Sequence, residues 1–392
     1  MGRRVVLDGN QAAAQGAVLA RPDVVAAYPI TPQTPLAQFF AKAVADGQLG
    51  AAPIEPESEH SVMSILTGAS LSGARTFSAT SSQGLFHMYE PYTRASTMRL
   101  PIVLAIVNRE VSSPQTIWGG QQDSMIVRDA GWIQIYAEDN QEILDATVMA
   151  FKIAEHPDVL LPINICFDGF FLSHLKEGLY LPEQEKVDAF LPKYKPTHCI
   201  LDPEKPMAVD PLSPSAFLQY YREQHMAAMD NARQVIRDIC AEWAMIFGRD
   251  YGGLIETYRM EDAEYVLVSS GSMTGSARVA VDLARDQGLA AGLLKMRAMR
   301  PFPYEEVRLW LRGKKAYGVV DRNVNYGWHM GNFAMEINTA MKEEDYVPSI
   351  SFIGGLGGAD LPPSVFTKAI GAVVAMAKSG KSAPEAMWLI NN

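Results

Sequence analysis

The sequence has little cysteine and no long apolar run. Its three cysteines, Cys166, Cys199 and Cys240, are scattered and form no C-x-x-C pair. They cannot hold an iron–sulfur cluster or a structural zinc, so we expect buried, reduced thiols of a cytoplasmic protein. No apolar run approaches the roughly 18 residues of a membrane span, and no signal peptide is visible. The sequence therefore predicts a cytoplasmic protein without a membrane segment.

Positive charge is also scarce. The chain has 34 lysines and arginines against 44 acidic residues, a formal net charge of -10, and nothing gathers the basic residues into a stripe. These features exclude a typical nucleic-acid-binding protein. Hydrophobic residues at 48% and charged residues at 20% are typical of an ordinary globular protein. A length of 392 residues favours two domains.

Short apolar runs alternate with helical segments in both halves of the chain. The clearest is the continuous run 101–107, as expected for a strand covered on both faces of a parallel sheet. The expected strands are 23–28, 75–80, 101–107 and 161–167, and later 265–270, 292–296 and 316–320. The expected helices are 61–73, 275–286 and 363–378. This alternation predicts a doubly wound α/β fold in the first half and a smaller α/β domain in the second.

A region without clear periodicity separates the two halves. Residues 175–214 are rich in proline and charge, which predicts an extended linker, and 216–247 has apolar residues at the spacing of one long helix or a helical pair. We therefore expect a first domain at 1–250, which includes the proline-rich excursion and long helix at about 175–250. A second domain is expected at 260–380.

Three polar clusters directly follow expected strands. In parallel sheets ligands bind at the carboxyl ends of the strands. Thr31 lies in the proline-rich turn 28–32, and Arg109 follows the longest apolar run. An arginine there suits the carboxylate of a substrate. The third cluster is 81–84, where Gly84 permits close approach of a ligand.

Each cluster also has a purely structural explanation. Thr31 is a candidate helix cap, and Arg109 a candidate surface ion-pair partner of Glu110. The acidic run 55–59 suits a solvated helix start, where the helix dipole favours carboxylates. His60 is best explained as a packed or capping histidine, and we expect no metal ligands. The glycine run 354–358 lacks the G-x-G-x-x-G register and predicts a tight turn, with a domain or subunit boundary as one place for it.

Taken together and in order, these segments resemble a known family. The segments YPITP at 28–32, ESEHS at 57–61, TSSQG at 80–84 and NR at 108–109 resemble the alpha subunit of thiamine-diphosphate-dependent 2-oxoacid:ferredoxin oxidoreductases, the pyruvate synthase family. The resemblance continues through 118–132, 167–174, 300–303 and 354–358. It implies a pyrimidine-type thiamine-diphosphate-binding domain with a doubly wound parallel sheet, followed by a smaller transketolase-C-like α/β domain.

The resemblance also implies roles for individual residues. Glu59 would be the carboxylate that hydrogen-bonds the aminopyrimidine N1′, whereas Glu57 receives no chemistry. Thr31 and Arg109 would hold the carboxylate of a 2-oxo acid. The remaining residues expected to border the cofactor are Pro29, Ser82, Gln83 and Gly84.

The implied reaction is the coenzyme A-dependent oxidative decarboxylation of a 2-oxo acid to acyl-CoA and CO2. Only Phe167-Asp168-Gly169 approaches the G-D-G motif that holds Mg²⁺ and the diphosphate, and the asparagines expected after it are missing. A beta subunit with that motif would supply this half of the site. Gamma-type and ferredoxin-like delta-type subunits would carry the [4Fe-4S] clusters and pass electrons to ferredoxin or another acceptor.

The substrate and two alternative functions stay open. Gly119-Gly120-Gln121 stands where pyruvate enzymes tend to carry an acidic residue and a bulky ring, so pyruvate or a bulkier acid such as phenylglyoxylate is expected. Thr31 argues against an oxalate-specific relative. One alternative is another thiamine diphosphate enzyme, either a dehydrogenase E1 component or a transketolase-like enzyme. The other is a non-catalytic assembly subunit, in which Glu59 only starts a helix and Arg109 lies on the surface.

Overall fold

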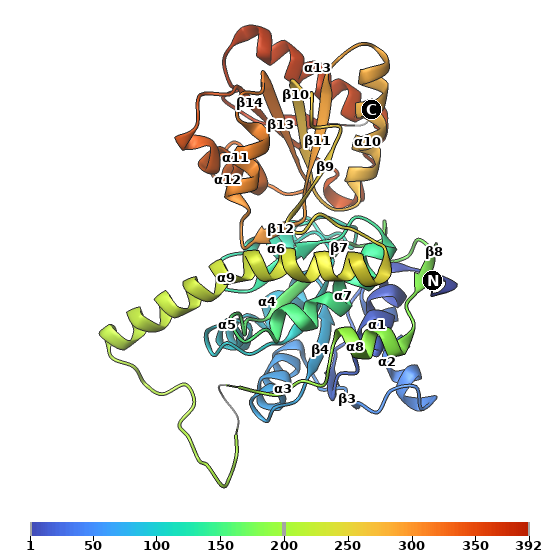
Figure 1. The fold of residues 1–392 in the computed structure, drawn as a ribbon, viewed down its shortest axis with the longest axis vertical. Helices are drawn as coiled ribbons and strands as arrows, with labels where there is room; N and C mark the ends of the chain where they lie inside the picture. The colour runs from blue at the N-terminus through green and yellow to red at the C-terminus, as the bar shows by residue number, and fades with distance from the viewer. Residues whose placement is uncertain (1, 198–200, 391–392) are drawn as a thin grey trace.

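The first half of the chain forms a largely parallel, seven-stranded sheet. The computed structural model describes residues 2–197 and 201–390 (Figure 1). In spatial order the strands are β12 (Ala298–Arg300), β6 (Ile133–Tyr136), β7 (Ile163–Asp168), β5 (Val103–Asn108), β4 (Thr76–Thr80), β2 (Val24–Ala26) and β3 (Ala52–Ile54). Only β12, which comes from the second half of the chain, pairs antiparallel with its neighbour. The four strands expected in this half are present, with ends within two residues of the prediction.

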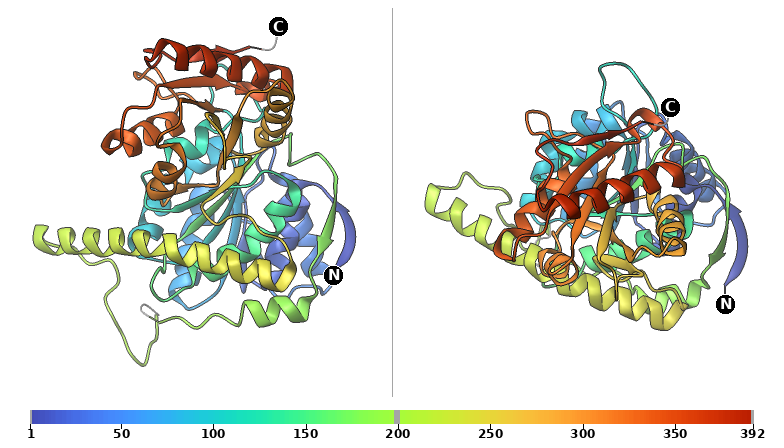
Figure 2. Two further views of the ribbon diagram at one scale, coloured as in Figure 1. Left: turned by 45° about the horizontal axis from the view of Figure 1, so that its top comes forward. Right: turned by 90° about the horizontal axis from the view of Figure 1, so that it is seen from above.

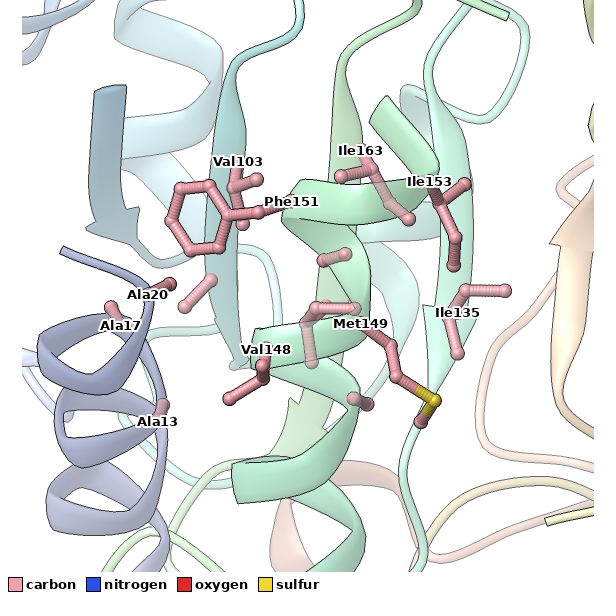
Figure 3. Close-up of a cluster of buried hydrophobic side chains, with 14 of the residues drawn as sticks. Ala13, Ala17, Ala20, Val103, Ile135, Val148, Met149, Phe151, Ile153 and Ile163 are labelled. Atoms are coloured by element: carbon pink, nitrogen blue, oxygen red, sulfur yellow. The ribbon is translucent and has the colours of Figure 1, made fainter. Parts of the chain in front are cut away.

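Helices cover both faces of this sheet. One face carries α1 (Gly9–Ala20), α2 (Thr34–Ala45) and α7 (Asn140–Ala154), and the other carries α3 (Glu59–Leu71), α4 (Ser82–His87), α5 (Tyr89–Thr97) and α6 (Gln122–Ile126). Successive β5 side chains point to opposite faces, so Val103 and Ala105 enter one core and Leu104 and Ile106 the other. Figure 3 shows Val103 beside Phe151 of α7 and close to the alanines of α1. Burial on both faces explains why the run 101–107 is continuously apolar.

The second half of the chain forms a six-stranded sheet. Its spatial order is β15 (Met387–Leu389), β14 (Ser349–Gly354), β13 (Ala316–Asp321), β10 (Tyr265–Ser269), β11 (Ala291–Met296) and β9 (Ile255–Tyr258). Helices α10 (Met273–Asp286) and α13 (Pro363–Ser379) cover one face, and α11 (Tyr304–Leu311) and α12 (Asn332–Ala340) pack into the other core. The short 3-10 helices are η1 (Met341–Glu343) and η2 (Leu356–Gly358). The fold contains the two expected α/β units, each a sheet covered by helices. The domain bounds 1–250 and 260–380 stay a prediction.

The expected linker at 175–214 contains regular structure, so that prediction is wrong over its first third. Strand β8 (Glu177–Leu181) pairs antiparallel with β1 (Arg3–Leu7), and α8 (Gln184–Phe190) follows it. Leu179 of β8 and Phe190 of α8 are almost fully buried in the core beneath α1. These two apolar positions stabilise the segment, and charged neighbours conceal them in the sequence.

The helical region 216–247 is one helix rather than a pair. Helix α9 (Ser215–Phe247) has 33 residues and no internal break. Its C-terminal half packs on the first core through Ile236 and Trp243, whereas its N-terminal half projects away from the body (Figure 2). Cys166 and Cys240 are buried free thiols, as expected, and Cys199 lies outside the described residues. No helix within residues 2–197 and 201–390 has the length and apolar character that a bilayer crossing requires.

A buried ion network joins the two sheets. Glu142 of α7 accepts from Lys295 at 2.8 Å and from Arg297 at 2.5 Å, both near the end of β11. Burial raises the pKa of Glu142, but Lys295 and Arg297 outweigh it and lower that pKa to about 2. Ionised Glu142 is therefore a part of the folded state near neutral pH.

Candidate active site

Glu59 is held at the start of helix α3. The side chain of Ser58, the residue before it, accepts from the backbone N–H of Ser61 at 3.4 Å and caps the helix. Glu59 is 7% exposed, and its Oε2 lies 3.0 Å from Nδ1 of His87 on α4. The neighbouring Glu57 is exposed and accepts from the Ser61 hydroxyl, which lowers its pKa. Of the two glutamates, Glu59 is the buried one that suits contact with a bound ligand.

Gly84 leaves room for the other Glu59 oxygen. A Cβ at position 84 would lie 2.6 Å from Glu59 Oε1 and 2.6 Å from Thr80 Oγ1, so only glycine fits between them. Thr80 Oγ1 is buried and has no hydrogen-bond partner within the part of the chain that the structure describes. A buried carboxylate oxygen and an unpaired hydroxyl thus lie around one point. Such a donor and acceptor set fits the nitrogen-rich edge of an aminopyrimidine.

The Gly84→Ala substitution should therefore displace the Glu59 carboxylate. We expect the turnover of the assembled enzyme to fall by about 10²-fold, because misplacing a reacting group by an ångström has that effect. The matched control is Gly68→Ala in the middle of α3, where a Cβ meets no atom within 4 Å. Steady-state kinetics of both variants test this, and equal turnover in both would contradict the assigned role of Gly84.

Arg109 is buried, and no acidic side chain among the described residues forms an ion pair with it. It follows β5 and is 8% exposed, and its guanidinium donates to the backbone oxygen of Thr31 at 2.8 Å and to Gln83 Oε1 at 2.5 Å. No ion pair connects it to any acidic residue within the described residues, so the expected alternative of a surface pair with Glu110 is wrong. Burial lowers the pKa of Arg109, an effect that nearby Asp123 partly offsets. A desolvated guanidinium without a carboxylate is suited to bind one from a ligand.

Asp123 holds the two clusters together, although its role was not apparent from the sequence. It is fully buried and accepts from the backbone N–H of Ser82 and of Arg109, both at 3.0 Å, and from Asn108 Nδ2 at 2.7 Å. Burial raises the pKa of Asp123 to about 6 despite these donors. The structure therefore places Ser82, Gln83 and Gly84 between Glu59 on one side and Arg109 with Thr31 on the other.

The glycines at 119 and 120 do not leave an open space. A Cβ at Gly120 would collide with the carboxyl of Glu110, and one at Gly119 with the backbone oxygen of Gly169. The Glu110 carboxyl also accepts a long hydrogen bond, 3.4 Å, from the backbone of Gly357. Burial raises the pKa of Glu110 to about 7. The small residues allow tight packing of this loop, so they do not by themselves explain a bulkier substrate.

Glu110 and Asp123 should make the folded chain more stable as the pH falls from 8 towards 5. Their raised pKa values mean that the folded state binds protons more readily than the unfolded state, so this contribution is lost as the pH rises through about 6 to 7. We expect a gain on the order of 1 kcal/mol for each group. Glu142 acts oppositely, because its lowered pKa removes stability as the pH falls from about 4.5 towards 2. Denaturant titrations from pH 3 to 8 should show a maximum near pH 5, and a steady rise to pH 8 would contradict these shifts.

The glycine run 354–358 forms the expected tight turn. Gly355, Gly357 and Gly358 all have positive φ angles, and the backbone N–H of Gly358 donates to the Gly119 oxygen at 2.7 Å. The turn after β14 of the second sheet therefore contacts the loop that follows Arg109 in the first. This contact is where the two halves of the chain meet beside the site.

Asp168 and Pro29 lie in surroundings that differ from those of Glu59 and Arg109. Asp168 ends β7 and accepts from the backbone and hydroxyl of Ser272 and forms an ion pair with Arg322 at 3.2 Å. It is thus already used to join the two sheets, and the described residues contain no group of three or more metal-ligand side chains. Pro29 is exposed and lines a mainly apolar cavity of about 400 Å³ between α2 and strands β2, β3 and β4. Its contact with a cofactor stays a prediction.

Both halves of the chain match known protein families. Residues 15–241 match the thiamine-diphosphate-binding domain of pyruvate flavodoxin/ferredoxin oxidoreductase, and residues 263–366 match core domain II of pyruvate:ferredoxin oxidoreductase. The chain is 47% identical to the alpha subunit of NADH-dependent phenylglyoxylate dehydrogenase from Aromatoleum evansii, over 98% of this chain and 94% of the relative. It is 46% identical to the pyruvate synthase subunit PorA from Methanocaldococcus jannaschii, over 91% of both.

A solved structure shares the fold. The 2-oxoglutarate:ferredoxin oxidoreductase from Magnetococcus marinus superposes with a TM-score of 0.75 at 18% identity, over 95% of this chain. This chain spans 65% of the length of that one. The matches to the two family models and to full-length relatives carry the classification, and the chain belongs to the pyruvate flavodoxin/ferredoxin oxidoreductase family.

Proposed function

We propose that this chain is the alpha subunit of a 2-oxo acid oxidoreductase. The reaction is the coenzyme A-dependent oxidative decarboxylation of a 2-oxo acid to acyl-CoA and CO2. The observation that carries the proposal is buried Arg109, which lacks an acidic partner among the described residues and is joined to buried Glu59 through Ser82, Gln83 and Gly84. This arrangement offers a guanidinium for a substrate carboxylate after β5 and a proton-carrying carboxylate at the start of α3.

Each residue has a separate task in this proposal. When bound, thiamine diphosphate would supply the carbanion and electron-sink chemistry that decarboxylation of a 2-oxo acid needs. Glu59 exchanges a proton with a ring nitrogen of the pyrimidine through Oε1. Arg109 neutralises and orients the substrate carboxylate beside the Thr31 turn, and Gln83 holds the guanidinium in place. Asp123 holds the backbones of Ser82 and Arg109 in place by accepting their N–H groups.

The remainder of the site is proposed to come from partner chains. A beta subunit with a G-D-G motif would hold Mg²⁺ and the diphosphate, and gamma-type and delta-type subunits would carry the [4Fe-4S] clusters. The names of the relatives as subunits support a hetero-oligomer, and three scattered cysteines support clusters elsewhere. Coenzyme A is the acyl acceptor, ferredoxin or another acceptor takes the electrons, and the cytoplasm is the proposed location.

Pyruvate and bulkier acids are both within the proposal. The relatives include subunits of a phenylglyoxylate dehydrogenase and of pyruvate synthases at nearly equal identity. The tight packing of Glu110 against Gly120 means that a bulky substrate would have to find its space elsewhere.

The test is purification of the chain with its native partners. We expect viologen reduction that depends on both coenzyme A and a 2-oxo acid, measured over a panel that includes pyruvate and phenylglyoxylate. Absence of such reduction with every 2-oxo acid, in a complex that contains thiamine diphosphate, would overturn the proposed function. Turnover of pyruvate equal to or better than that of phenylglyoxylate would contradict only the proposal of a bulkier substrate and would leave the proposed reaction in place.

A further inference from the structure

The inference concerns His87, which lies at the end of helix α4 beside Glu59. We propose that His87 is a positioning residue that orients the Glu59 carboxylate, so that Oε1 and not Oε2 meets the cofactor. The inference rests on the proposed function, because it assigns the partner of the carboxylate that this function needs.

The geometry gives the two carboxylate oxygens different surroundings. Oε2 lies 3.0 Å from His87 Nδ1, whereas Oε1 accepts no hydrogen bond from the described residues and packs against Gly84, on the side of the Thr80 hydroxyl. An ionised carboxylate only accepts hydrogen bonds, so Nδ1–H of His87 donates to Oε2. Oε1 is therefore the oxygen that remains for a ring nitrogen.

This contact also connects a buried carboxylate to the surface. The side chain of His87 is 59% exposed, against 9% for that of Glu59.

The chain contains a matched control one residue after Glu59. His60 is also exposed and also faces a carboxylate, but its Nε2 lies 3.9 Å from Glu90 Oε2, beyond hydrogen-bond distance. His60 lies on the same helix as Glu59 and has the same side chain as His87, but its ring forms no hydrogen bond with Glu59.

The experiment compares His87→Leu, His87→Asn and His60→Leu in the complete complex. Cofactor-depleted complexes are titrated with thiamine diphosphate by calorimetry, and kcat and KM for the 2-oxo acid are measured after reconstitution. We expect His87→Leu to weaken cofactor binding and lower kcat by about tenfold or more each, the effect of one lost hydrogen bond to a charged group, with KM unchanged. His87→Asn should restore most of both, since its amide nitrogen takes the place of Nδ1. His60→Leu should match the wild type.

Three results would overturn the inference. They are wild-type cofactor affinity and kcat in His87→Leu, an Asn variant no better than the Leu variant, and an equal loss in His60→Leu. If His87→Leu does not assemble, the Asn variant decides alone: near wild-type affinity supports the inference and a tenfold loss overturns it. Glu59→Gln separates the two levels, because full turnover in that variant overturns the catalytic role of Glu59, whereas an inactive Glu59→Gln with a normal His87→Leu overturns only the role of His87. Absence of 2-oxo acid-dependent reduction in the wild-type complex is the result that overturns the proposed function.

Discussion

Replacing Glu59 by glutamine should lower the turnover of the assembled complex on the order of 10³-fold, the usual size of a lost acid–base group. Glutamine keeps the shape of the side chain, but it cannot carry the exchanged proton. Because Glu59 is buried at the capped start of α3, where glutamine fits equally well, we expect the subunit composition to stay unchanged. Steady-state turnover together with size-exclusion chromatography checks both parts of this expectation.

Glu57→Gln is the control for this prediction. Glu57 lies two residues earlier, is exposed and accepts from the Ser61 hydroxyl, so its loss should change turnover by less than about twofold. Undiminished turnover in Glu59→Gln would support the structural explanation, in which this acidic run only starts a helix. An equal loss in both variants would show that the charge of the segment matters rather than the position of one carboxylate.

Replacing Arg109 by methionine should lower kcat/KM for the 2-oxo acid by roughly 10²- to 10³-fold, as expected for the loss of a desolvated charge that pairs with a ligand carboxylate. The affinity for thiamine diphosphate should remain, because Arg109 contacts Thr31 and Gln83 and not Glu59. Arg109→Lys should recover only a part of the activity, since an ammonium cannot reach both neighbours and a carboxylate with the planar geometry of a guanidinium.

The control for Arg109 is Arg21→Met. Arg21 pairs with Asp188 at the surface, with 61% of its side chain exposed, and such pairs contribute little. Kinetics over a range of 2-oxo acid concentrations, together with a cofactor titration, separate the substrate site from the cofactor site. A loss of cofactor affinity in Arg109→Met without a change in kcat/KM would contradict the assignment.

The sequence was sufficient to find the strand ends at which the site is built. Arg109 follows a continuous apolar run, and the cluster 81–84 follows a run of strand-forming residues. Because ligands bind at the carboxyl ends of parallel strands, these residues are expected to lie close together. Thr31 could be placed in the same way, from the proline-rich turn after β2. The resemblance to a family then selected Glu59 over Glu57, a choice that burial now supports.

His87 and Asp123 could not be found in this way, because a short helix brings His87 to the site and a loop brings Asp123 there. His87 lies three residues after Gly84, on the same face of α4, but the length and start of that helix were not apparent from its six residues. Asp123 is fourteen residues beyond Arg109 and returns to it through a loop whose path depends on packing against Gly169 and Gly358. The pairing of β1 with β8 was missed because about 175 residues separate the paired positions of the two strands, and short-range patterns do not reveal such a contact.

The glycine turn at 354–358 limits how the parts of this chain can be exchanged among relatives. It supports the loop after Arg109 through Gly119, and it accommodates Glu110 from the other half of the molecule. A hybrid that takes its first half from one relative and its second half from another would therefore disrupt these contacts between the two halves, close to Arg109. The loop 110–121 and the turn 354–358 should be inherited as a pair, although more than 230 residues lie between them.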